Sequence, residues 1–189
     1  MSRDVSALIL AGGKATRFGG VAKHELLVDG QTIFDRQVAV LESRVAEILV
    51  SAPRDFAGYR TVRDVREGVG PLAGIAAGLG ACATPWLLVV AGDMPYITGE
   101  LIDQLIGLAR SSHDPHAADS LDAVGIKLDG WPEPLLCVLH TRVVATVERM
   151  IEAGDFKASK LLTDSGLRVH WLEDIDRAAV RNINAPADL

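Results

Sequence analysis

A glycine-rich loop that carries three cations directly follows the first apolar run of the chain. Residues 10–23 read LAGGKATRFGGVAK, and the cations are Lys14, Arg17 and Lys23. Glycines let backbone N–H groups come close to a ligand, and the cations place positive charge around it. The spacing matches neither the P-loop nor the G-x-G-x-x-G dinucleotide fingerprint. The loop therefore predicts a triphosphate site of another kind.

A single carboxylate ends the second informative segment. Residues 87–92 form an apolar run that closes on glycine, and Asp93 comes next, followed by Met94 and Pro95. A carboxylate oxygen there could hold Mg²⁺, whose other positions would go to water and phosphate oxygens. Alternatively, Asp93 caps the helix that is expected to begin near Thr98. The cationic loop elsewhere in the chain favours the metal over the cap.

Two further segments offer polar groups to a ligand. Asp64 precedes a Gly-Pro pair at 70–71, which places proline in the first turn of a helix. The Asp64 carboxylate could accept a hydrogen bond from a nucleobase or a ribose hydroxyl, or help to order the metal, or simply be solvated. Asn182 and Asn184 lie two residues apart on an extended segment, so both could face one ligand. Ordinary turn chemistry is the alternative for these asparagines.

Length, charge and cysteine usage narrow the class of protein. The chain has 189 residues, 49% of them hydrophobic, and we expect one domain over residues 1–189. A formal net charge of −6 argues against nonspecific binding to nucleic acid or to anionic membranes. The short apolar run after Asp4 suits neither a signal peptide nor a membrane span, which predicts a cytoplasmic protein. Cys82 and Cys137 are isolated and predict neither a zinc site nor a disulfide.

Apolar runs alternate with helical patterns along the chain, which predicts an α/β fold. The expected strands are 5–10, 46–52, 86–91, 123–128, 134–139 and 168–172, and the expected helices are 33–45, 72–82, 99–110, 141–152 and 158–164. The sheet should be largely parallel at first and mixed where the last strands follow closely. Ligands of open α/β sheets bind at the carboxyl ends of strands, so the segments after Leu10 and Ala91 would face one pocket.

The chain resembles the molybdenum cofactor guanylyltransferases, which are MobA-like nucleotidyltransferases, over nearly its full length. The similar segments are L-A-G-G with a following Arg, Gly and Lys at 10–23, G-P-L-A-G at 70–74, G-D-x-P at 92–95, and N-x-N-x-P-x-D/E-L at 182–189. This resemblance implies a Rossmann-like three-layer fold with a mostly parallel mixed sheet. It also implies Mg²⁺-dependent transfer of GMP from GTP to the phosphate of molybdopterin, with release of pyrophosphate.

The resemblance further implies a role for each matching residue. Arg17, Lys23 and Asp93 are the expected catalytic residues: the two cations would hold the triphosphate, Lys23 would stabilise charge at the α-phosphate, and Asp93 would bind Mg²⁺. Asn182 and Asn184 would face the pterin phosphate. The expected nucleotide contacts are Leu10, Ala11, Gly12, Gly13, Lys23, Ser51, Asp64 and Asp93.

The chain departs from the family pattern at three positions, and two lysines elsewhere could contact a second anion. Thr16 stands where a second arginine can occur, Ala22 replaces a frequent acidic residue, and Ser51 occupies the place of an asparagine that could reach the nucleotide. None of these changes removes a charge that phosphoryl transfer requires. Lys157 and Lys160 could add a second anion contact, although exposed helix lysines are usually only solvated.

Two other functions stay open at this point. One is the cytidylyl branch of the same cofactor chemistry, or a nucleotidyltransferase for another sugar or alcohol phosphate; the Gly12-Gly13 pair favours guanine, because the cytidylyl relatives resemble L-A-A-G. The other is an inactive nucleotide-binding regulator, and the presence of Arg17, Lys23 and Asp93 together argues against it. The expected partners are GTP and molybdopterin, with transient contact to cofactor-insertion proteins or molybdoenzymes.

Overall fold

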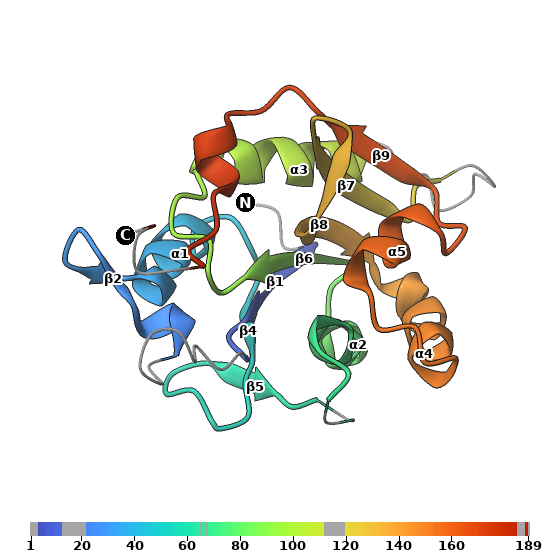
Figure 1. Cartoon of the computed structure of the whole chain (residues 1–189), viewed down its shortest axis with the longest axis horizontal. Helices are drawn as coiled ribbons and strands as arrows, with labels where there is room; N and C mark the ends of the chain where they lie inside the picture. The colour runs from blue at the N-terminus through green and yellow to red at the C-terminus, as the bar shows by residue number, and fades with distance from the viewer. Residues whose placement is uncertain are drawn as a thin grey trace.

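Seven strands form one sheet in the order β5-β4-β1-β6-β8-β7-β9. The computed structural model describes residues 4–12, 22–64, 66, 68–111, 120–184 and 188. The strands of this sheet are β1 (Val5–Leu10), β4 (Ile48–Ser51), β5 (Arg60–Val62), β6 (Trp86–Ala91), β7 (Ala123–Leu128), β8 (Trp131–His140) and β9 (Val169–Leu172). Figure 1 shows the sheet running through the middle of the molecule from β5 to β9.

The sheet is mostly parallel, and β8 makes it mixed. Strand β1 is parallel to β4 and β6, β4 is parallel to β5, and β7 is parallel to β9, whereas β8 is antiparallel to both β6 and β7. In this register Leu10 pairs with Ser51 on one side and with Ala91 on the other. Three strands therefore end level with one another at the same edge of the sheet.

Helices cover both faces of the sheet, as Figure 1 shows. Helices α1 (Ile33–Leu41) and α3 (Gly99–Ser111) lie on one face, and α2 (Pro71–Ala81), α4 (Val144–Glu152) and α5 (Ala158–Thr163) lie on the other. The 3₁₀ turns are η2 (Lys23–Glu25), η3 (Thr141–Val143) and η4 (Arg177–Val180). The predicted three-layer α/β fold is confirmed.

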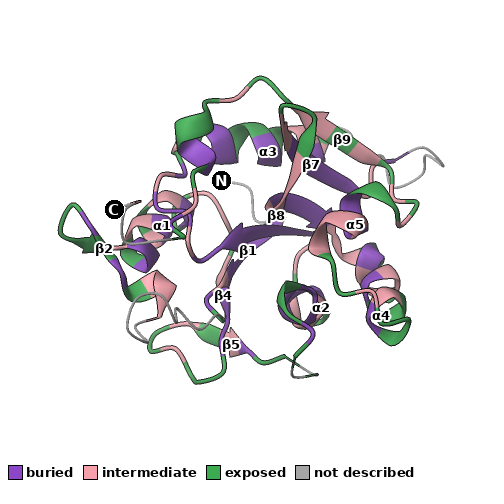
Figure 2. Ribbon diagram, viewed as in Figure 1, coloured by how far each residue is buried: buried purple, intermediate pink, exposed green. Residues whose placement is uncertain are grey.

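Strand β6 lies at the centre of the buried interior, which Figure 2 colours purple. All six of its residues are buried, as expected for a strand covered on both faces. Because side chains alternate along a strand, Leu88 and Val90 pack with α3, whereas Leu87 and Val89 pack with α2 and α4. A continuous apolar run, rather than an alternating one, follows directly from this double coverage.

The β2–β3 hairpin, the short edge strand β5 and the first residues of β8 were not predicted from the sequence. Strand β8 begins at Trp131, ahead of the expected start at 134, and the Asp-Gly turn before it has φ angles of 51° and 81° at Asp129 and Gly130. Strands β2 (Leu27–Val28) and β3 (Gln31–Thr32) are joined by a second Asp-Gly turn of the same kind. Asp-Gly favours tight hairpins because both residues tolerate positive φ. Strand β5 is too short to show a pattern.

Two expected helices differ from the observed ones by more than one residue at an end. The helix expected over 33–45 is wrong beyond residue 41, because the carbonyl of Leu41 accepts hydrogen bonds from the N–H groups of both Arg44 and Val45 and the last turn becomes irregular. The helix expected over 141–152 begins as the 3₁₀ turn η3. The side chain of His140 accepts a hydrogen bond from the Arg142 backbone at 3.1 Å, which caps this tighter first turn.

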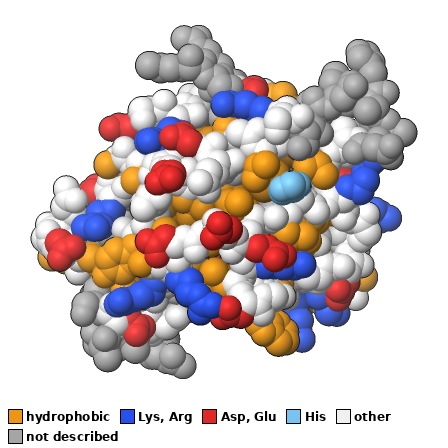
Figure 3. Space-filling model, turned by 90° about the horizontal axis from the view of Figure 1, so that it is seen from above, with side chains coloured by type: hydrophobic (Ala, Val, Ile, Leu, Met, Phe, Trp, Pro, Cys, Tyr) orange, Lys and Arg blue, Asp and Glu red, His pale blue; other side chains and the backbone are white. Residues whose placement is uncertain are grey.

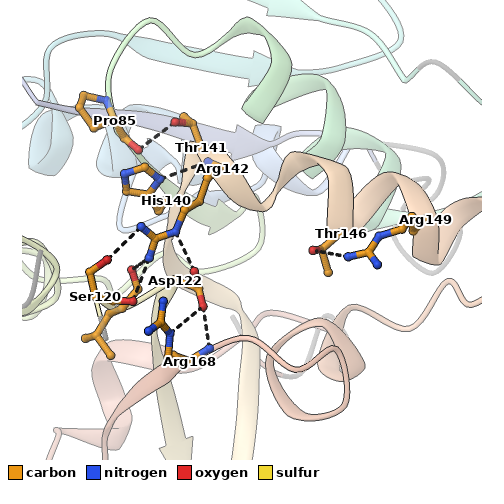
Figure 4. A network of polar contacts seen from close by, with 10 residues as sticks. Pro85, Ser120, Asp122, His140, Thr141, Arg142, Thr146, Arg149 and Arg168 are labelled. Carbon is orange, nitrogen blue, oxygen red and sulfur yellow. Dashed lines mark hydrogen bonds and ion pairs between the residues drawn. The ribbon is translucent and has the colours of Figure 1, made fainter. Parts of the chain in front are cut away.

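Arg142, which follows the end of β8, contacts residues just before the start of β7, and Figure 4 shows this network together with Arg168 just before β9. Its guanidinium donates to Asp122 at 2.8 Å, to the Ser120 side chain at 3.1 Å and to the Ser120 carbonyl at 2.9 Å. Asp122 also accepts from the Arg168 backbone at 2.9 Å. Partial burial opposes ionisation of Asp122, but these hydrogen bonds and the two arginine charges lower its pKa overall. The cluster fastens β7, β8 and β9 together.

Charged side chains of both signs are interspersed on the face shown in Figure 3, which is the upper side of Figure 1. None of the described helices is both long and apolar enough to cross a membrane.

Candidate functional site

A pocket of about 290 Å³ lies where β1, β4 and β6 end. The last residues of β1 and β6, and the residues that follow them, line this pocket. The first turn of α2 closes one side. The lining residues are Leu10, Ala11, Gly12, Lys23, His24, Ser51, Asp64, Gly70, Pro71, Gly74, Ala91, Gly92, Asp93 and Leu135. The structure thus brings together, in one pocket, Leu10, Ala11, Gly12 and Lys23 of the first loop with Ser51, Asp64 and Asp93.

Main-chain hydrogen bonds continue the sheet into the wall of the pocket. The N–H of Ala11 donates to the Ser51 carbonyl at 2.9 Å, and the N–H of Gly92 donates to the Leu10 carbonyl at 3.1 Å. A Cβ atom at Gly92 would lie 2.6 Å from that Leu10 oxygen, so only glycine permits this approach. The segments that carry Gly12 and Asp93 are therefore held side by side.

Gly74 makes room for the other wall. A Cβ atom there would lie 2.6 Å from Ser51 Oγ and 2.9 Å from Leu10 Cδ2. A larger residue at this position of α2 would have to displace the Ser51 or Leu10 side chain at the strand ends. This contact explains why the G-P-L-A-G segment places its second glycine inside a helix, where glycine is otherwise unfavourable.

Lys23 links three segments that are distant in the sequence. Its Nζ lies 2.7 Å from Asp93 Oδ2 and donates to Asn184 Oδ1 at 2.9 Å. Both partners of the ion pair are partly exposed, with 28% of the Lys23 side chain and 20% of the Asp93 side chain accessible. The first loop, the end of β6 and the C-terminal segment therefore meet at one ammonium group.

The C-terminal segment is fixed to the same place by its backbone. The N–H of Ile183 donates to the Asp93 carbonyl at 2.9 Å, and Ile183 itself is fully buried. The N–H of Asn184 donates to Asp188 Oδ2 at 2.8 Å. Asn182 Oδ1 is buried and has no hydrogen-bond partner within the described ranges. Neither asparagine lines the pocket, and only Asn184 contacts one of its residues through its side chain.

Ser51 and Asp64 form a second polar pair in the wall. Ser51 is almost fully buried, and its Oγ donates to Asp64 Oδ1 at 3.3 Å. Partial desolvation raises the pKa of the Asp64 carboxyl, and the hydrogen bond from Ser51 opposes that rise. The pair presents one carboxylate to the pocket beside the end of β4.

Two residues of the pocket and one carboxylate near Asp93 were missed by the sequence reasoning. His24 lines the pocket, and its ring packs against Phe56 at 5.2 Å between centroids. Burial lowers the pKa of His24, while Glu25 and the Ala11 backbone oppose that shift. Leu135 enters the wall from β8. No spacing pattern singles out either residue, because both depend on how distant elements pack.

Glu133, also on β8, is the third missed feature. Burial raises the pKa of its carboxyl, and the negative charge of Asp93 raises it further, against a hydrogen bond with the Leu135 backbone. The antiparallel insertion of β8 beside β6 places this second carboxylate near the first.

Some expected residues are not part of the described site. Gly13, Lys14, Thr16 and Arg17 lie outside the described residues. Lys157 and Lys160 do not line the pocket, and Lys160 Nζ instead lies 2.6 Å from Asp155 Oδ2. The second anion contact expected from these lysines therefore finds no support in the geometry.

Comparison with known proteins identifies the family. Residues 7–170 match the MobA-like NTP transferase domain. The chain belongs to this family. The resemblance seen in four short segments of the sequence predicted this family, and the match over residues 7–170 confirms it.

Relatives of similar length carry one recurrent name. The chain is 31% identical to the molybdenum cofactor guanylyltransferase of Serratia proteamaculans, with 100% of this chain and 93% of the relative covered. It is 32% identical to a probable molybdenum cofactor guanylyltransferase of Chloroflexus aggregans, with 98% and 91% covered. Nearly whole chains are therefore similar, and not the nucleotide loop alone.

Solved structures share the fold. The molybdopterin-guanine dinucleotide biosynthesis protein A of Archaeoglobus fulgidus superposes with a TM-score of 0.78 at 24% identity and covers 97% of this chain and 94% of its own. The 2-C-methyl-D-erythritol 4-phosphate cytidylyltransferase of Thermus thermophilus superposes with a TM-score of 0.71 at 21% identity, with 98% and 95% covered. The fold thus also occurs in a cytidylyltransferase, and base choice must come from the pocket.

Proposed function

We propose that the protein transfers GMP from GTP to the terminal phosphate of molybdopterin. A phosphate oxygen of molybdopterin attacks the α-phosphorus of GTP, the bond from that phosphorus to the oxygen bridging to the β-phosphate breaks, and pyrophosphate leaves. The product is the guanine dinucleotide form of the cofactor. The contact between Lys23 and Asp93 at the pocket wall carries the proposal, supported by full-length similarity to proteins named guanylyltransferases.

The pocket residues divide between nucleotide binding and charge stabilisation. The main chain of residues 10–12, with Ser51 and Asp64, would bind the base and ribose at the ends of β1 and β4. An ammonium group can donate three hydrogen bonds, and the contacts of Lys23 to Asp93 and Asn184 use two of them. A third, directed to the α-phosphate, would stabilise the charge that develops during transfer.

The remaining predicted roles belong to the same proposal. Gly13 would extend the main-chain contacts to guanine and ribose, and Arg17 would hold the triphosphate together with Lys23, as the family resemblance implies. Asn184, held by Lys23, and Asn182, whose Oδ1 is buried without a described partner, would face the phosphate of molybdopterin. The C-terminal segment would then carry the second substrate to the same ammonium group that serves the first.

A Mg²⁺ ion fits the donor set of the pocket. Mg²⁺ is commonly bound by one or two carboxylates together with water and substrate phosphates. Asp93 supplies one such carboxylate, and within the described residues no group of three or more His, Cys, Asp or Glu side chains gathers into a metal cage. The bound ion would supply positive charge to the phosphates of GTP, while Asp93 would fix its place at the end of β6.

The cellular setting follows from the same proposal. A protein that finishes the cofactor inside the cell would work in the cytoplasm. Transient contact with cofactor-insertion proteins or molybdoenzymes would then pass the product on.

A nucleotide screen tests the function. Purified protein is incubated with molybdopterin, Mg²⁺ and each of the four nucleoside triphosphates, and pyrophosphate release is measured. Of the four nucleoside triphosphates, only GTP should give pyrophosphate release. The Asp93→Asn variant should lose most of this release. Asp103→Asn is the matched control, because Asp103 is an exposed aspartate on α3 paired with Arg44. Release from CTP and not from GTP would overturn the base assignment.

A further inference from the structure

A buried glutamine lies behind the turn that carries Asp93. Gln37 is on the inner face of α1, in the same buried row as Ile33, Phe34 and Leu41, and it has no exposed surface. Polar side chains in such a position are uncommon, and most buried polar atoms find hydrogen-bond partners. Among the described residues Gln37 Oε1 has no partner, whereas Nε2 has two. The partners of Gln37 are therefore informative.

Those partners bracket the candidate metal ligand. Gln37 Nε2 donates to the Ala91 carbonyl at 2.7 Å and to the Met94 carbonyl at 3.0 Å. These are the carbonyls immediately before and after the Gly92-Asp93 pair. Two bonds from one nitrogen fix both ends of the turn at once.

Other contacts hold the same turn from different directions. The neighbouring Arg36 donates through Nε to the Pro95 carbonyl at 3.1 Å. The carbonyl of Asp93 accepts from the Ile183 N–H at 2.9 Å, and the N–H of Gly92 donates to Leu10. The turn is thus supported by α1, by β1 and by the C-terminal segment, and Gln37 contributes to this support through a fully buried polar side chain.

We propose that Gln37 is a positioning residue that sets the location of the Asp93 carboxylate in the pocket. The inference rests on the proposed role of Asp93 in catalysis. Phosphoryl transfer depends on alignment, and a displacement of about 1 Å can cost on the order of 10²-fold in rate. Loss of the amide would leave the Ala91 and Met94 carbonyls without this donor, so the turn would relax and move Asp93.

The alternative is that Gln37 only stabilises the fold. A double-mutant cycle separates the two roles, because a residue that acts through Asp93 loses its effect once Asp93 is changed. Gln37→Met keeps the length and shape of the side chain and removes both donated bonds. Leu41→Ala is the control: it creates a cavity one turn further along α1, at a residue that does not line the pocket.

Single-turnover rates with excess enzyme are measured well below each melting temperature. Gln37→Met should lower the transfer rate by about tenfold or more and change the KM for GTP by less than about threefold. In the Asp93→Asn background the same change should cost less than about twofold. Leu41→Ala should lower the melting temperature and leave the rate within about twofold of the wild type. Rate losses that multiply in the double variant would overturn the proposal.

Mn²⁺ binding gives a readout that does not need turnover. Electron paramagnetic resonance titration of Mn²⁺ onto the protein with a non-hydrolysable GTP analogue should show weaker binding in Gln37→Met than in Leu41→Ala. Equal binding in both would contradict the positioning role. If the wild type bound no Mn²⁺, the metal role of Asp93 would be removed. The positioning role of Gln37 would still be supported if the rate losses of Gln37→Met and Asp93→Asn did not multiply in the double variant.

A second variant covers the case in which Gln37→Met does not fold. Gln37→Asn keeps the amide and shortens its reach, so it should show the same rate loss and the same dependence on Asp93. If Gln37→Asn transferred GMP at a rate within about twofold of the wild-type rate, the proposal would be contradicted. Failure of the wild type to use any nucleotide would instead count against the proposed function, which the nucleotide screen reports separately.

Discussion

Lys23 Nζ lies 2.7 Å from Asp93 Oδ2, although 70 residues separate the two along the chain. The pair joins the segment that follows the first strand to the end of β6, and Asn184 adds the C-terminal segment at 2.9 Å. Partly exposed ion pairs contribute little to stability, about 0–1 kcal/mol. The contact is therefore better explained by the pocket it organises than by the fold it stabilises.

Replacement of Lys23 should separate activity from stability. Lys23→Met removes the ammonium and keeps the length of the chain, so the rate of transfer should fall by roughly 10²–10³-fold, as for loss of a charge stabiliser. The free energy of unfolding should change by no more than about 1 kcal/mol. Steady-state rates and urea unfolding measure the two quantities. A large loss of stability with a small loss of rate would contradict the assigned role.

Gly92 should not tolerate a methyl group. In Gly92→Ala the new Cβ would meet the Leu10 carbonyl oxygen, and relief of that contact must displace the backbone next to Asp93. Both the transfer rate and the stability should fall, the latter by about 1–3 kcal/mol.

Gly80→Ala is the matched control for Gly92→Ala. Gly80 lies within α2, and a Cβ there would have no neighbour within 4 Å. Alanine should stabilise the helix by about 0.5–1 kcal/mol without a change in rate. Thermal unfolding and transfer assays of both variants check the pair, and equal behaviour of the two would refute the steric account.

Six strands and the mixed, mostly parallel character of the sheet could be predicted from the sequence, whereas the strand order and the exact helix ends could not. Apolar runs predict buried strands because β1 and β6 are covered on both faces. The Asp-Gly turns at 29–30 and 129–130 were a signal that was present and not used. The end of α1 depends on the Leu41 carbonyl, which accepts hydrogen bonds from both Arg44 and Val45. No residue pattern predicts this arrangement.

The site divides in the same way. That the segments after Leu10 and Ala91 share one pocket follows from the rule that ligands bind at strand carboxyl ends, and the structure confirms it. The contacts of Lys23 with Asp93 and Asn184 span large separations, so spacing alone could not predict them. Gln37 had a local signal, a polar residue within the apolar row of a helix, but its partners are visible only in three dimensions.

Asp122 should make stability depend on pH in a defined direction. Its pKa is lowered in the folded state, so its contribution is present above the unfolded value of about 4 and is lost as pH falls through the folded pKa. Asp122→Asn should therefore lower the free energy of unfolding at pH 7 by about 1–3 kcal/mol. The two proteins should converge at acidic pH. An unchanged difference between pH 7 and pH 3 would count against this account.

Glu133 should have the opposite effect. Its pKa is raised by burial and by the charge of Asp93, so its favourable contribution is present below the unfolded value of about 4.3 and is lost as pH rises through the folded pKa. Glu133→Gln should then be more stable than the wild type at pH 7 and equal to it below about pH 4. Chemical unfolding at both pH values tests the sign, and a less stable variant at pH 7 would be the contrary result.

Product formation tests the central claim most directly. The protein is incubated with molybdopterin, Mg²⁺ and either [α-³²P]GTP or [α-³²P]CTP, and the pterin product is isolated. The account predicts a labelled guanine dinucleotide from GTP, no labelled product from CTP, and loss of the label in Lys23→Met and Asp93→Asn. Label from CTP in place of GTP, or undiminished label in the two variants, would contradict it.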